Sequence, residues 1–99
     1  MFTATETAVN NLKNYLEANN MQTGIRITCR QGKRLKPGLG IVFSNAKEND
    51  QSFELQGVCF VVNRELLEKS GGITLDYIDH GPDKGYFLSP IDPSAVCAH

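Results

Sequence analysis

Apolar residues near the start of the chain recur at helical spacing. Val9, Leu12 and Leu16 stand at positions i, i+3 and i+7, so they would line one face of an α-helix. Thr3, with a glutamate three residues later, fits a capping box at the start of such a helix. The pattern predicts an amphipathic helix over residues 3–19.

After this segment the apolar residues change to a period of two. Ile25, Ile27 and Cys29 alternate with polar residues, which is typical of a half-buried strand. The pair Gln56-Gly57 separates two apolar runs and predicts a tight hairpin turn. Strands are predicted over residues 25–30, 39–43, 52–55, 58–62, 73–79 and 86–89.

A short helix interrupts the strands. Asn63 is a suitable N-cap for a helix over residues 64–69, and Gly71 is a suitable residue to end it. Pro90 excludes a central strand beyond it, so residues 90–99 are predicted to be a non-regular tail. One helix followed by strands and a small second helix predicts a small β-rich domain with flanking helices.

The composition is that of one ordinary globular domain. The chain has 99 residues and a formal net charge of −1, which indicates a single domain over residues 1–99 and does not favour nucleic-acid binding. No apolar run approaches the length of a membrane span. The N-terminus lacks the basic and apolar segments of a signal peptide. A cytoplasmic location without membrane contact is therefore expected.

The three cysteines, Cys29, Cys59 and Cys97, are widely spaced and form no CxxC or CxC pair. This spacing favours reduced thiols over a disulfide framework. Cys29 and Cys59 fall in apolar strand patterns. Free cysteine is among the most buried residue types, so both are predicted to be core residues.

A basic segment follows the first predicted strand. Arg30, Lys33, Arg34 and Lys36 place four cations within seven residues, among glycines. Guanidinium groups and exposed backbone N–H groups bind anions, so this segment is a candidate site for an anionic ligand or an acidic partner. The alternative is a solvated loop with scattered cations.

The end of the chain holds the best candidate for a metal site. Cys97 and His99 supply a thiolate and an imidazole, which both bind iron or zinc, and a homodimer would double this set to four ligands. The alternative is that two residues at a chain terminus bind nothing. His80 follows an aspartate, but no nucleophile is placed beside it by the sequence, and no enzyme activity is expected.

Several short sequence segments, taken in order, resemble those of the HesB/IscA-like family of A-type iron–sulfur cluster carriers. They are Gly24-Ile25-Arg26-Ile27, Lys47-Glu48-Asn49-Asp50, Phe53-Glu54-Leu55-Gln56-Gly57-Val58, Val61-Val62-Asn63-Arg64-Glu65-Leu66-Leu67, Ile73-Thr74-Leu75-Asp76-Tyr77, Gly85-Tyr86-Phe87-Leu88 and Ser89-Pro90. The resemblance covers the chain to about Pro90. It implies a mainly β HesB-like domain, a small β-sandwich or pseudobarrel with one N-terminal helix and one short internal helix.

The resemblance also implies three cysteine ligands, one in a glycine-rich loop and two in a C-terminal Cys-Gly-Cys. Arg34 stands at the first of these positions, and Val96-Cys97-Ala98-His99 lies near the other two. A divergent iron–sulfur cluster carrier with unusual ligands, acting with assembly or client proteins, is the leading hypothesis. The alternative is an interaction module that kept the fold, lost the metal and uses the basic segment for an anion or acidic partner.

Overall fold

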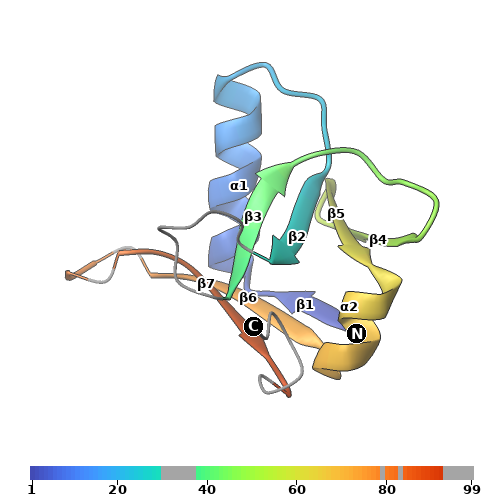
Figure 1. The fold of residues 1–99 in the computed structure, drawn as a ribbon. Helices are drawn as coiled ribbons and strands as arrows, with labels where there is room; N and C mark the ends of the chain where they lie inside the picture. The colour runs from blue at the N-terminus through green and yellow to red at the C-terminus, as the bar shows by residue number, and fades with distance from the viewer. Residues whose placement is uncertain (30–37, 79, 83, 93–99) are drawn as a thin grey trace.

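The computed structural model describes residues 1–29, 38–78, 80–82 and 84–92, which form two sheets and two helices (Figure 1). In chain order the elements are β1 (Phe2–Ala4), α1 (Glu6–Ala18), β2 (Ile25–Cys29), β3 (Leu39–Phe43), β4 (Asp50–Leu55), β5 (Val58–Asn63), α2 (Arg64–Ser70), β6 (Ile73–Ile78) and β7 (Gly85–Pro90). The predicted fold class, mainly β with one N-terminal and one short internal helix, is confirmed.

The first residues form a strand rather than the start of the helix. Phe2–Ala4 pairs in parallel with β6, and Thr5 is the N-cap of α1, with its side chain accepting a hydrogen bond from the Ala8 N–H at 3.3 Å. The predicted start of the helix at Thr3 is therefore wrong. Pairing with a distant strand buries Phe2, and this burial favours the strand. A local capping pattern carries no information about such a distant contact.

The four-stranded sheet has the order β3-β2-β5-β4. β2 and β5 run parallel at its centre, while β3 and β4 pair antiparallel at its two edges. Gln56 and Gly57 join β4 to β5 with φ of 50° and 83°, the left-handed backbone that a two-residue hairpin turn requires. The predicted hairpin is confirmed.

The small helix α2 is capped as predicted. The Asn63 side chain accepts hydrogen bonds from the N–H groups of Glu65 and Leu66 at 3.0 and 3.3 Å. Gly71 ends the helix with a left-handed φ of 72°. Both caps lie at the residues that the sequence marked.

The second sheet is three-stranded, with the order β1-β6-β7. Pro90 ends β7, an edge strand, where its missing N–H leaves no gap in the ladder. Beyond it, the N–H groups of Ile91 and Asp92 donate to Gly72 O and Ser70 O at 2.9 and 2.7 Å. The tail thus leaves the described fold beside the C-terminal end of α2.

The core lies between the two sheets and α1. Phe2 of the three-stranded sheet packs against Phe53 and Phe60 of the four-stranded sheet, with ring centroids 5.7 and 5.1 Å apart. Val9 and Leu12 of α1 are also buried in this core. The helix contacts chiefly β6 and β5, so it packs where the two sheets meet, with β3 beside it (Figure 1).

Candidate functional site

The residues that the sequence marked for chemistry lie outside the part of the chain that the structure describes. This holds for both candidate metal ligands and for all four cations of the basic segment: Cys97, His99, Arg30, Lys33, Arg34 and Lys36. Their roles stay predictions. What the structure does fix is the points at which their segments leave the fold.

The basic segment and the tail leave the described fold near opposite ends of α2, the basic segment near its start and the tail beside its end. Ile27 of β2 is paired with Val62 of β5, one residue before Asn63, the N-cap of α2, so β2 ends on the side of the sheet where this helix begins. The basic segment follows Cys29 directly. The tail begins at Asp92, which is bonded to Ser70 at the other end of the same helix. Seven helical residues span about 10 Å, so the two segments start at one end of the molecule.

The two cysteines that were predicted to be core residues differ in their surroundings. Cys29 is half-buried and packs against the core. It is disulfide-bonded, so the expectation of a reduced thiol is wrong at this position. Cys59 is a free thiol on the face of β5 opposite to Val58 and Phe60, and it does not join the core cluster. The apolar run suggested that both faces of β5 are buried, but Cys59 lies near the start of this strand, where it stays partly exposed.

Cys59 lines a surface cleft of about 630 Å³ between α1, residues 20–24 and the β4–β5 turn. Lys13 and Glu17 line the same cleft. It lies at the start of β5, whereas α2 follows the end of that strand. The cleft and the departure points of the basic segment and the tail are therefore at opposite ends of the four-stranded sheet.

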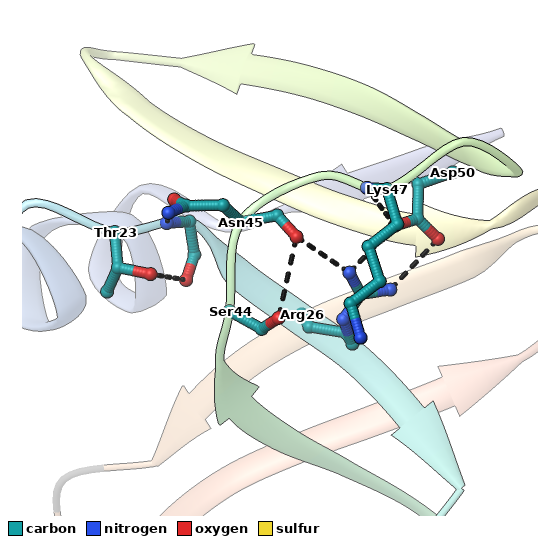
Figure 2. A network of polar contacts seen from close by, with 7 residues as sticks. Thr23, Arg26, Ser44, Asn45, Lys47 and Asp50 are labelled. Carbon is teal, nitrogen blue, oxygen red and sulfur yellow. Dashed lines mark hydrogen bonds and ion pairs between the residues drawn. The ribbon is translucent and has the colours of Figure 1, made fainter.

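A buried ion pair, which the sequence analysis did not single out, lies on the four-stranded sheet (Figure 2). Arg26 of β2 donates two hydrogen bonds to the two carboxylate oxygens of Asp50, at 2.9 and 2.7 Å. The side chains of Arg26 and Asp50 are only 14% and 3% exposed. Arg26 also donates to Asn45 O at 2.8 Å, and Asp50 accepts from the Lys47 N–H at 2.7 Å.

This pair has electrostatic and structural consequences. The hydrogen bonds from Arg26 lower the pKa of Asp50 against the opposing effect of burial, and the Asp50 carboxylate raises the pKa of Arg26. Both charges are committed to each other and to the backbone of residues 44–50. The pair holds this loop against β2 and offers no free charge to a ligand. In the sequence, the only features that pointed to this pair were the polar position of Arg26 in the alternating strand and the acidic turn that ends at Asp50.

The described residues alone do not make a site for iron or a cluster. Among residues 1–29, 38–78, 80–82 and 84–92, no three His, Cys, Asp or Glu side chains come together as a metal site. Within the same ranges neither helix has the length and apolar character needed to cross a membrane. A site with three or more such ligands would therefore include residues outside these ranges or residues of a second copy.

Comparison with solved structures identifies the architecture. The chain superposes on Escherichia coli SufA, a protein involved in biosynthesis of iron–sulfur clusters, with a TM-score of 0.74 and 18% identity, covering 99% of this chain and 85% of SufA. It superposes on IscA with a [2Fe-2S] cluster with a TM-score of 0.69 and 19% identity, covering 91% and 85%. The fold is that of IscA and SufA. The predicted HesB/IscA-like resemblance is confirmed at the level of the fold.

A protein from Aquifex aeolicus, solved in solution, has the same IscA-like architecture. Its TM-score is 0.64 at 26% identity, with 88% of each chain covered. No family model and no curated protein sequence matches the chain. At 19% and 18% identity, the likeness to IscA and SufA is a likeness of fold.

Proposed function

We propose that this protein handles iron or iron–sulfur clusters as cargo, as a carrier rather than an enzyme, and exchanges them with assembly or client proteins in the cytoplasm. The observation that carries the proposal is the shared fold with IscA, whose structure contains a [2Fe-2S] cluster. SufA, which has the same fold, is involved in cluster biosynthesis. Fold alone does not give chemistry, so the ligands have to be argued from this chain.

In the reduced protein, Cys97 and His99 are the proposed ligands. The tail starts at Asp92 beside Ser70, and five extended residues reach about 17 Å, which is longer than α2. Cys97 is therefore within reach of the end of β2, where the basic segment begins. Two ligands from each of two chains would complete a set of four, so the proposed carrier is a homodimer.

The experiment is an anaerobic absorption spectrum with iron and acid-labile sulfide content, before and after cluster reconstitution with a reductant. Broad visible bands with stoichiometric iron and sulfide are expected. Cys97→Ser should lose most of the bound iron and sulfide, and His99→Ala should reduce them. Cys59→Ser is the matched control, because Cys59 is a free thiol at the opposite end of the sheet, and it should keep the full content.

Size-exclusion chromatography with light scattering tests the dimer. The reconstituted protein should elute as a dimer that carries the visible absorbance. The Cys97→Ser variant should elute without this absorbance. A colourless protein after reconstitution, or full cluster content in Cys97→Ser, would refute the proposed ligands.

A second candidate function is an interaction module that has lost the metal. The observation that favours it is that the described residues contain no converging ligand set, while an arginine, which has no lone pair to donate to iron, stands at the position of the loop cysteine. Its predicted ligand is an anion bound by Arg30, Lys33, Arg34 and Lys36. The test is thermal unfolding with added inorganic phosphate or citrate. Stabilisation that Arg34→Glu abolishes would support it, and no shift would count against it.

A further inference from the structure

Cys29 is oxidised in the folded chain. It is disulfide-bonded and lies half-buried at the end of β2. There it pairs with Leu39 across the β2–β3 ladder, at the point where the basic segment leaves the sheet. The disulfide therefore ties another part of the chain to the base of that segment.

The cysteine that is bonded to Cys29 follows from the inventory of the chain and from the register of the sheet. The chain has three cysteines, Cys29, Cys59 and Cys97, and Cys59 is a free thiol. Cys59 precedes Phe60, which pairs with the first residue of β2, so it lies about 16 Å from Cys29 along the strand direction. A disulfide needs two Cα atoms within about 7 Å of each other. Within the chain, the partner of Cys29 is therefore Cys97.

The start of the tail is compatible with this pairing. The Asp92 N–H donates to Ser70 O at 2.7 Å, which fixes this start beside the end of α2. β2 ends on the side of the sheet where α2 begins. The seven-residue helix is about 10 Å long, whereas the five residues that follow Asp92, up to and including Cys97, reach about 17 Å when extended. The chain is long enough to join the two cysteines.

The same cysteine is the thiol ligand that the proposed function requires. A thiolate binds a metal ion, but a sulfur in a disulfide is no longer a thiolate. We propose that a reversible disulfide between Cys29 and Cys97 is a redox switch, which controls whether the Cys97 thiol is available to bind iron or a cluster. The ligand role of Cys97 rests on the proposed function, whereas the pairing and its reversal are measured without any metal.

Opening the switch consumes two equivalents of a low-molecular-weight thiol such as glutathione. The first, as a thiolate, attacks one sulfur of the disulfide, so that the S–S bond breaks and a mixed disulfide and one protein thiolate form. The second attacks the mixed disulfide and releases the oxidised small molecule. Two electrons pass to the protein, and Cys29 and Cys97 each take up a proton to end as thiols.

A permanent structural bond is the other role that this disulfide could have. Among the described residues, the cluster of fully buried side chains contains no cysteine, and Cys29 packs against that cluster as a partly buried residue. In the cytoplasmic setting of the proposed function, disulfides are usually transient and either catalytic or redox-sensing. Both points favour a bond that opens while the sheets stay folded.

The first test maps the bond in metal-free protein. Protein purified without reductant is alkylated, digested without reduction and analysed by mass spectrometry. We expect a peptide that links Cys29 to Cys97, with Cys59 alkylated. In buffers with a rising ratio of reduced to oxidised glutathione, alkylation of Cys97 should rise while Cys59 is alkylated throughout. Cys59→Ser is the control and should keep the linked peptide. Circular dichroism should show that the reduced protein stays folded.

The second test connects the switch to metal binding. Zinc is the probe, because it has no redox chemistry and so does not open the bond itself. In anaerobic titration calorimetry, reduced wild type should bind zinc at least about tenfold more tightly than oxidised wild type. The monomer fraction of Cys29→Ser, purified without reductant, should bind like reduced wild type, because its Cys97 has no partner. The comparison of the two wild-type forms decides the question even if this variant does not fold.

Three results would overturn the proposal. They are linkage of Cys29 to any sulfur other than that of Cys97, a bond that survives every glutathione ratio and opens only on unfolding, and equally tight zinc binding by the oxidised and reduced forms. Loss of zinc binding in folded Cys29→Ser would also overturn it and make Cys29 a ligand. If alkylation of Cys97 follows the glutathione ratio but neither form binds zinc, the thiol switch is supported and the proposed ligands are refuted.

Discussion

At the scale of residues, Asp50 shows how a buried charge is made tolerable. Its side chain is 3% exposed, yet it is paired in a two-pronged hydrogen bond with Arg26 and accepts a third bond from the Lys47 N–H. Removing one partner of such a pair leaves the other charge buried without compensation. The pair therefore matters for stability, although it offers no free group for ligand binding.

Asp50→Asn is expected to lower the free energy of unfolding at pH 7 by about 2–3 kcal/mol. The pKa of Asp50 is lower in the folded protein than its ordinary value of 3.8. The stabilisation by the carboxylate is thus present above that value and is lost as the pH falls through the folded-state pKa. Urea unfolding at pH 7 and pH 3 should show the difference between wild type and variant shrinking at the lower pH.

Glu54→Gln serves as the control for this measurement, because Glu54 is an exposed carboxylate on the same strand. It should change stability by less than about 0.5 kcal/mol at both pH values. A constant difference between wild type and Asp50→Asn across the pH range would contradict the assignment of the effect to ionisation of Asp50.

At the scale of elements, the helix ends show when local sequence patterns are enough to predict where a helix begins and ends. α2 is short, and its caps, Asn63 and Gly71, are the ones that the sequence marked. α1 begins at Glu6 instead of near Thr3, because the preceding residues pair with β6. Both threonines are suitable caps, and only the distant strand decides between them.

Asn63→Ala should destabilise the protein by about 1 kcal/mol, because the N–H groups of Glu65 and Leu66 lose their acceptor. Asn63→Asp keeps an acceptor oxygen at the N-terminus of α2 and should retain the wild-type stability or increase it slightly. Thermal unfolding of the three proteins checks this. Equal losses in both variants would show that the side-chain amide, rather than the cap, is what the site needs.

At the scale of the whole molecule, Phe2 joins the two sheets. It lies in the three-stranded sheet and contacts Phe53 and Phe60 of the other one, and it is 3% exposed. The residue belongs to a three-residue strand near the chain terminus, so its burial depends on parallel pairing with β6. This contact packs the two sheets against each other.

Phe2→Ala should lower the free energy of unfolding by about 3–4 kcal/mol, because it leaves a cavity between the sheets. Phe87→Ala is the comparison, since Phe87 is 41% exposed, and it should lose less than about 1 kcal/mol. Denaturant unfolding followed by circular dichroism would measure both. A loss for Phe2→Ala no greater than that for Phe87→Ala would mean that the sheets do not depend on this contact.

Much of the fold was predictable because its signals are local. The strand over residues 39–43 was predicted with the bounds that β3 has, and the Gln56-Gly57 turn and the caps of α2 follow from the backbone preferences of single residues. The strand Phe2–Ala4 was missed, because three residues contain too little periodicity to show a strand. The assignment of Cys59 to the core was wrong because an apolar run does not say which face another element covers.

The candidate site was predictable in part. Residue types alone pointed to Cys97 and His99 and to the cations from Arg30 to Lys36, and these stay predictions. The Arg26–Asp50 pair escaped, because its members are 24 residues apart and meet only when β2 and β4 flank β5. The order of strands in the sheet brings the two members of such an ion pair together, and short sequence motifs do not show that order.

By itself the sequence determined the mainly β character, the two helices, the hairpin and the resemblance to the HesB/IscA-like fold, because these depend on periodicity, turn residues and the order of short words. Only the tertiary structure decided that the first residues form a strand, that Arg26 and Asp50 pair, and that β3 lies at the edge of its sheet beside an apolar groove. Each of these depends on segments far apart in the chain. Their contacts arise from the packing of whole sheets, which local propensity does not encode.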